Sequence, residues 1–124
     1  MIIMMSEHKM KGSAKRLRKV LQALGVEFRH TECLKLAARL HGFEDWYQYL
    51  ERDLSKPLSP FDEQLSDHDF AARDEFQMAV LKAAGLEPVA RELLDRVNPT
   101  GSWAKQPTEE PVWEALAGND PLDT

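Results

Sequence analysis

The stretch "LHGFEDWYQYLERD", residues 40–53, decides the fold, because it joins two predicted helices through a tight turn. Gly42 is typical of the left-handed residue that ends a helix, and Phe43 is the apolar residue expected directly after it. A helix, a tight turn and a second helix also form the unit that many proteins use to read DNA. The stretch therefore poses a choice between a DNA-reading turn and a turn that only closes a small core.

The residues after this turn predict a third helix over residues 44–53. Apolar side chains recur there at the i, i+3, i+4, i+7 spacing of one helical face. On this spacing Trp46 belongs to the core and Tyr47 is half-buried, whereas Tyr49 falls outside the apolar face and is expected to be exposed. The face consists of Phe43, Trp46, Tyr47 and Leu50.

Two helices are predicted before the turn. The first runs from a Ser13 cap to about Leu24, with an apolar stripe on one face and basic residues on the others. Gly25 is well placed to end it. The second spans residues 31–40, with Thr31 as its cap, and is almost entirely apolar.

The remainder of the chain predicts two more helices and an irregular tail. Prolines interrupt residues 54–66 and predict a linker there. A fourth helix is expected over residues 67–84 and a fifth over residues 88–97. The fourth is expected to bury Ala72, Phe76, Ala79, Val80 and Ala83, and the fifth Ala90, Leu93, Leu94 and Val97.

The predicted fold is therefore all-α, a small bundle of about five helices. Its expected divisions are a basic three-helix module over residues 1–53, the linker, an acidic helical pair over residues 67–98 packed on the first module, and a tail over residues 99–124 that contains proline, glycine and tryptophan.

Charge is distributed unevenly over the 124 residues, whose net charge is −5. Residues 1–43 hold nine Lys or Arg against three Glu, whereas residues 44–124 hold seven Lys or Arg against eighteen Asp or Glu. The basic part could face a polyanion, attract the acidic part, or form an ordinary solvated surface. No apolar run is long enough to span a membrane, the N-terminus lacks the pattern of a signal peptide, and Cys33 is the only cysteine, so we expect a cytoplasmic protein.

Residues 14–50, "AKRLRKVLQALGVEFRHTECLKLAARLHGFEDWYQYL", resemble the glyoxalase-related protein domain, a small helical module of bacterial proteins that are often carried by mobile elements. The matching residues are His30, Thr31, Ala37, Gly42, Phe43 and Trp46. True glyoxalases hold a divalent metal with His and Glu residues on βαβββ sheets, and this chain predicts neither the strands nor such a ligand set. The resemblance implies a helical fold and carries no lyase activity.

The predicted third helix has the wrong charge for a DNA-reading helix. It contains four carboxylates against one arginine, and such a helix would be repelled by the phosphates of a groove. If nucleic acid is bound, the first helix is the better candidate, and a nucleic-acid-binding regulator is the alternative function. The candidate contacts are Lys11, Lys15, Arg16, Arg18 and Lys19.

A metal- or thiol-dependent enzyme is a more distant alternative. His30 and Cys33 are three residues apart at a helix start, and His41 and His68 would have to complete a zinc site. A capping turn with a buried cysteine explains the same residues without metal. No phosphate-binding glycine loop or nucleophile elbow is present, so we expect no enzymatic activity and no cofactor.

The leading hypothesis is a non-catalytic protein-binding or regulatory module from a bacterial mobile element. Its partner would be another protein, such as a nucleic-acid-handling or defence complex that the module inhibits or assists. Two tryptophans in the tail favour an ordered or docking segment rather than a purely disordered one. The candidate partner-binding residues are Trp103, Glu109, Glu110, Trp113 and Leu116.

Overall fold

The computed structural model describes residues 1–103 and shows helices there without any strand. The predicted all-α class is thereby confirmed. None of the helices within these residues has the length and apolar content needed to cross a bilayer. The helices are α1 (Glu7–Ala23), α2 (His30–Leu40), α3 (Trp46–Leu50), η1 (Asp62–Gln64), α4 (Asp67–Ala83), η2 (Glu87–Val89) and α5 (Ala90–Val97), where η denotes a 3₁₀ turn.

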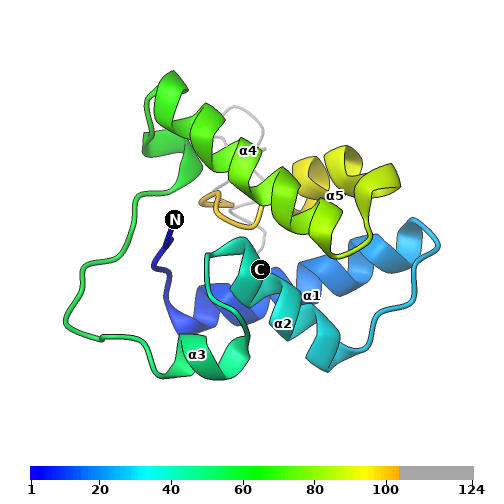
Figure 1. The fold of residues 1–124 in the computed structure, drawn as a ribbon, viewed down its shortest axis with the longest axis horizontal. Helices are drawn as coiled ribbons and strands as arrows, with labels where there is room; N and C mark the ends of the chain where they lie inside the picture. The colour runs from blue at the N-terminus through cyan, green and yellow to red at the C-terminus, as the bar shows by residue number, and fades with distance from the viewer. Residues whose placement is uncertain (104–124) are drawn as a thin grey trace, which may run out of the picture.

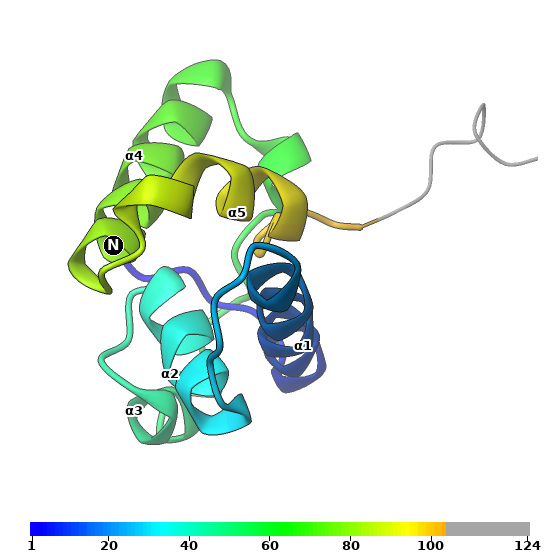
Figure 2. The same cartoon turned by 90° about the vertical axis from the view of Figure 1, so that its right-hand side faces the viewer.

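The four longer helices contact one another in a closed ring, with α1 against α2, α2 against α4, α4 against α5 and α5 against α1 (Figure 1). Figure 2 shows α4 and α5 on one side of the molecule and α1 to α3 on the other. The short α3 packs against α2. The main core lies inside the ring and is formed by Ala14, Leu17, Leu21, Cys33, Leu36, Ala37, Leu40, Leu81, Leu86, Ala90, Leu93, Leu94 and Val97.

Helix α1 begins earlier than the sequence predicted. Its cap is Ser6, whose hydroxyl accepts the Lys9 N–H at 3.2 Å, and Glu7 in the first turn faces the positive helix end. Ser13, the predicted cap, lies fully buried in the middle of the helix and donates to the Pro99 carbonyl at 3.0 Å. The prediction was wrong because Gly12-Ser13 is typical of a helix start. Here these two small residues lie inside the helix and let Pro99 and Trp103 approach it closely.

Helix α2 begins one residue before its predicted cap. Arg29 occupies the cap position, and its N–H donates to the Glu32 carboxylate at 2.8 Å. Thr31 therefore lies inside the helix and its role as the cap is corrected. The helix ends at Leu40 with His41 as its C-terminal cap, and Gly42 follows with φ of +96°, the left-handed conformation that the sequence predicted for it.

Helix α3 is half as long as predicted, and its buried face is different. Asp45 caps it, with the carboxylate accepting the Gln48 N–H at 2.8 Å. Tyr49 is completely buried, whereas Tyr47 and Leu50 are exposed, so the predicted positions of these three residues were wrong. Trp46, predicted for the core, is half-buried. Phe43 lies before the helix begins, so a helical spacing counted from Phe43 does not identify the buried face of α3.

Helix α4 has the predicted bounds and is capped by Ser66, whose hydroxyl accepts the Asp69 N–H at 3.1 Å, but it buries another face than predicted. Its buried side chains are Arg73, Gln77 and Leu81 at the i, i+4, i+8 spacing, and two of the three are polar. Ala72, Ala79 and Ala83 are exposed, and Phe76 and Val80 are half-buried. The apolar stripe predicted the wrong buried face, because the polar side chains of the face that is buried form hydrogen bonds with other segments.

Helix α5 confirms its prediction, since Ala90, Leu93, Leu94 and Val97 are its buried residues. A second core cluster lies beside α3 and is covered by the N-terminal segment. Ile3 donates its N–H to the His41 carbonyl at 2.8 Å, and Met4 and Ser59 pair with each other, also at 2.8 Å. This cluster is formed by Ile3, Met5, Met10, Ala38, Phe43 and Tyr49.

Candidate binding surfaces

A basic groove lies between α1 and the first residue of α2. Three of its five lining side chains are lysine or arginine, and it is a shallow, open depression with a volume of about 440 Å³. Three of the predicted nucleic-acid contacts line this groove, because positions 15, 18, 19 and 22 share one face of a helix with 3.6 residues per turn. The lining residues are Lys15, Arg18, Lys19, Gln22 and His30; we call this the basic groove.

The charges of the basic groove are not neutralised by neighbouring carboxylates. Within residues 1–103, no hydrogen bond or ion pair engages the side chains of Lys15, Arg18 or Lys19. Lys11, the fourth candidate on this helix, lies outside the groove and pairs with Glu7 at 2.9 Å. The groove therefore presents uncompensated positive charge to solvent, which favours an anionic ligand.

Arg16, the fifth basic candidate, has a structural role. Its Nε donates to the Val97 carbonyl at 2.9 Å and its guanidinium also reaches the Arg96 carbonyl at 3.3 Å. These are carbonyls at the C-terminal end of α5, which lack partners within their own helix. The same guanidinium lies 4.5 Å from the centre of the Trp103 ring. The structure therefore separates Arg16 from the basic groove.

Trp103, a predicted partner-binding residue, is half-buried against α1. Its indole N–H donates to the Asn98 carbonyl at 2.6 Å, and the Lys9 ammonium lies 3.1 Å from the ring centre. Lys9 also donates to the Gly101 carbonyl, and burial lowers the pKa of Lys9 to about 8. Residues 98–103 are thus held against α1 by hydrogen bonds and ring contacts. The other predicted partner residues, Glu109, Glu110, Trp113 and Leu116, lie outside the described residues.

The exposed apolar side chains include a group on α3 and the segment that follows it. Tyr47 is 77% exposed and Leu54 is 79% exposed, and Leu50 and Leu58 are exposed as well. Tyr47 borders a hollow of about 340 Å³ between α2 and α3. The hollow is lined by Thr31, Leu34, Lys35, Asp45, Trp46 and Tyr47, and we call it the α2–α3 hollow.

Helix α3, which forms one side of the α2–α3 hollow, is anchored to the core by Tyr49. Tyr49 fixes α3 from below, because its hydroxyl donates to the Met5 carbonyl at 2.6 Å and its ring meets the Phe43 ring edge-on, with 5.3 Å between the ring centres. The Trp46 ring lies 5.1 Å from the Tyr49 ring. Such aromatic pairs add to the stabilisation that burial of their area gives. The sequence pattern did not predict the burial of Tyr49, because its partner Met5 is distant in the chain.

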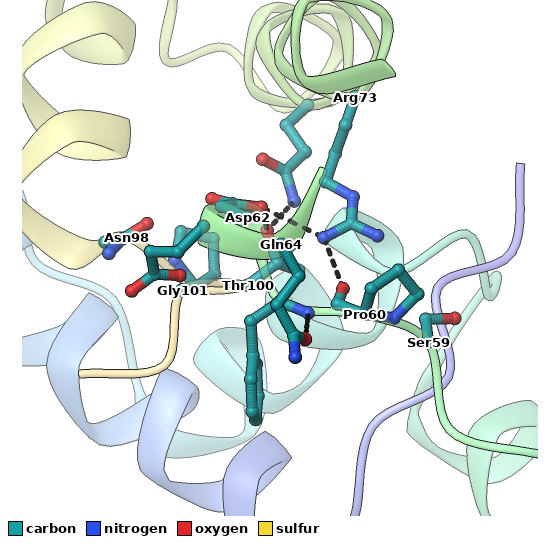
Figure 3. A network of polar contacts seen from close by, with 12 residues as sticks. Ser59, Pro60, Asp62, Gln64, Arg73, Asn98, Thr100 and Gly101 are labelled. Carbon is teal, nitrogen blue, oxygen red and sulfur yellow. Dashed lines mark hydrogen bonds and ion pairs between the residues drawn. The ribbon is translucent and has the colours of Figure 1, made fainter. Parts of the chain in front are cut away.

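A buried polar network connects η1, α4 and the end of α5 (Figure 3). The Asp62 carboxylate accepts from Arg73 at 3.0 Å and from the Thr100 hydroxyl at 2.7 Å. Arg73 also donates to the Pro60 carbonyl at 3.0 Å, and the Gln77 amide reaches Thr100 at 3.2 Å. Because these partners satisfy one another, the network holds separate segments together.

The residues proposed for a metal or thiol site have different surroundings. Cys33 lies in the apolar core, and burial raises the pKa of its thiol, opposite to the shift that activates a nucleophile. His41 is completely buried, its Nδ1 lies 2.7 Å from the Ala37 carbonyl, and burial lowers its pKa to about 4. His30 and His68 are exposed. Within residues 1–103, no three His, Cys, Asp or Glu side chains converge as metal ligands.

Comparison with known families matches residues 3–65 to the model of the glyoxalase superfamily protein family. The chain belongs to this family. The match confirms the resemblance seen in the sequence and extends it in both directions, so that it includes the N-terminal segment that covers Tyr49 and the Asp62 of the polar network. No curated protein and no solved structure matches this family member.

Proposed function

We propose that this member of the glyoxalase superfamily protein family is a non-catalytic module that binds another protein through the α2–α3 hollow. The observation that carries the proposal is Tyr47, which is 77% exposed beside a hollow that also contains Leu34 and Trp46. Tyrosine and tryptophan are the residues that most often dominate the binding energy of protein interfaces. An apolar side chain of a partner would fill the hollow, with Lys35 and Asp45 at its rim.

The contacts that anchor α3 support the proposal. The Asp45 cap and the buried Tyr49 hold α3 in place before any partner arrives. A preformed surface loses less conformational entropy on association than a mobile one, so a small hollow can contribute more to affinity. Leu54 and Leu58 are further exposed apolar side chains, in the segment after α3.

A non-catalytic role is supported by the partners of the interior titratable groups. Asp62 serves to hold Arg73 and Thr100, and Cys33 is surrounded by apolar side chains. Catalytic acids, bases and nucleophiles need a pKa suited to proton transfer and access to a substrate. A regulatory role in the cytoplasm, for instance as an inhibitor or accessory factor of a nucleic-acid-handling or defence complex carried with a mobile element, remains part of this proposal.

Capture of partners by the immobilised full-length chain tests the proposal. We expect at least one protein to be captured by the wild type and lost with Tyr47→Ser combined with Leu54→Ser. The purified partner should then bind the variant about 30-fold more weakly, the effect of an interface residue worth about 2 kcal/mol. Phe70→Ala, which truncates another exposed apolar side chain, is the matched control and should bind normally.

Two results would contradict the proposal. One is a purified partner that binds the double variant and the wild type equally well. The other is a concentration-dependent dimer, seen by analytical ultracentrifugation, that disappears in the Tyr47 variant, because the surface would then pair two copies of this chain.

A further inference from the structure

We infer that the basic groove between α1 and the start of α2 binds the phosphate backbone of nucleic acid without reading its sequence. Binding of nucleic acid is a second function, beyond the proposed protein binding, and it uses other residues. It is concave, it contains Lys15, Arg18, Lys19 and His30, and the side chains of the first three are unpaired within residues 1–103. A backbone phosphate would therefore not have to displace an existing carboxylate partner.

Glu32, the one acidic residue of α2, is engaged by Arg29. Glu32 accepts the Arg29 N–H at 2.8 Å, and its carboxylate also lies 3.8 Å from the Arg29 guanidinium. Lysines are also the residues expected for this role, because they bind phosphate as point charges on flexible stems and tolerate variation in its position.

The length of the groove suits several phosphates. From Lys15 to Gln22 the helix rises by about 10 Å at 1.5 Å per residue. A nucleic-acid strand carries one phosphate for about every 3.4 Å along the axis, so about three phosphates fit alongside the groove. Three cationic side chains on α1 match that number, and His30 adds a hydrogen-bond donor from α2.

The distribution of charge would orient the molecule on a nucleic acid. Residues 44–103 hold thirteen Asp or Glu against six Lys or Arg, so the long-range field of the described residues turns the basic groove toward a polyanion. The carboxylates next to α3 would be repelled by the phosphates that line a DNA groove. They belong to Glu44, Asp45 and Glu51. The contact would therefore involve backbone phosphates and not the edges of bases.

The site is independent of the α2–α3 hollow. Lys35 lines that hollow and a further depression beside Phe28, but it does not line the basic groove. The two surfaces can therefore be altered one at a time. A protein with both could hold a partner and a nucleic acid together.

The test is fluorescence anisotropy of a labelled 20-base-pair mixed-sequence DNA duplex titrated with the full-length chain at 20 to 200 mM salt. We expect log K to fall with log salt with a slope of about −3, which corresponds to three neutralised phosphates. Lys15→Glu with Lys19→Glu should weaken binding at least tenfold at 20 mM salt. Lys35→Glu with Lys56→Glu makes the same change in net charge on other exposed residues and should have a much smaller effect.

Three results would overturn the inference: no binding at 20 mM salt, equal weakening by the two double variants, or competition by 1 mM inorganic phosphate at constant ionic strength that removes the duplex completely. The third result would indicate a site for a single free anion. Tyr47→Ser with Leu54→Ser should bind the duplex like the wild type, so that loss of protein capture and loss of DNA binding remain distinguishable.

Discussion

The Arg73 guanidinium lies 3.0 Å from the Asp62 carboxylate, and the two side chains are only 7% and 13% exposed. Asp62 precedes α4 and Arg73 lies within it, so the pair fixes the segment after α3 to the helix that closes the ring. Burial of two charges is costly in itself and is offset here by the added hydrogen bonds to Pro60 and Thr100. The pair specifies one arrangement of η1, α4 and residues 98–103.

Asp62→Ala should destabilise the fold by about 3–5 kcal/mol, because it leaves the Arg73 charge buried without its partner. Asp62→Asn should cost less, since the amide oxygen can still accept from Arg73 and Thr100. Urea denaturation followed by circular dichroism measures both. Glu92→Gln, which removes a pair with Arg96 at the surface, should leave the midpoint unchanged. An equally small effect of Asp62→Ala would show that the pair does not hold these segments.

Two tyrosines on α3 should respond in opposite ways to truncation. Tyr49→Ala removes a fully buried ring and should cost about 3–5 kcal/mol. Tyr47→Ala removes an exposed ring and should change stability by less than about 0.5 kcal/mol. The same denaturation experiment compares them. Similar losses for the two variants would mean that α3 buries the face that the sequence pattern predicted.

The class of fold and the order of the helices could be predicted because they depend on local signals. Glycine caps such as Gly42, the Ser66 cap and the apolar face of α5 are each encoded within a few residues. The family resemblance was visible for the same reason, since its residues lie around one turn. The three α1 side chains of the basic groove were found because they share a single helix.

The predictions that failed depend on contacts between distant segments. Tyr49 is buried by Met5, and Gln77 is buried because Leu40 and Thr100 accept from its amide. The periodicity of apolar residues within one helix cannot predict hydrogen bonds to residues that are distant in the sequence. The separation of Arg16 from the other basic residues has the same origin, because the carbonyl that it meets belongs to Val97. His30 could not be assigned to the basic groove until α2 was placed beside α1.

Gly42→Ala should be far more damaging than Gly25→Ala, although both glycines have positive φ angles, of +96° and +83°. A Cβ atom on Gly42 would lie 1.8 Å from the Met1 carbonyl oxygen, whereas one on Gly25 would meet nothing within 4 Å. We expect about 1–2 kcal/mol for Gly25→Ala from backbone strain alone. Gly42→Ala adds overpacking and should exceed about 3 kcal/mol.

Hydrogen exchange gives a second measurement on the Gly42 variant. The Ile3 N–H donates to the His41 carbonyl, so displacement of the N-terminal segment should speed its exchange. Equal stability of the two alanine variants, with Ile3 still protected, would contradict the close packing of this segment on Gly42.

His41 should make the fold sensitive to mild acid. Its ring is completely buried, its Nδ1 meets the Ala37 carbonyl, and its Nε2 has no hydrogen-bond partner among residues 1–103. Burial lowers its pKa to about 4, and the nearby charges of Arg73 and Lys9 act in the same direction. An unfolded histidine has a pKa of about 6.5. Between these values the unfolded chain takes up a proton that the folded chain does not bind.

The contribution of His41 to stability is therefore complete above pH 6.5 and is lost as the pH falls toward 4, at up to about 1.4 kcal/mol per pH unit. Urea unfolding at pH 7, 6 and 5 should show this slope in the wild type and a smaller one in His41→Phe, while the exposed His8→Gln keeps the wild-type slope. Carboxylates add their own acid dependence, but it is common to all three proteins and cancels in the differences. An imidazole signal of His41 that titrates near pH 6.5 in NMR spectra of the folded protein would refute this assignment.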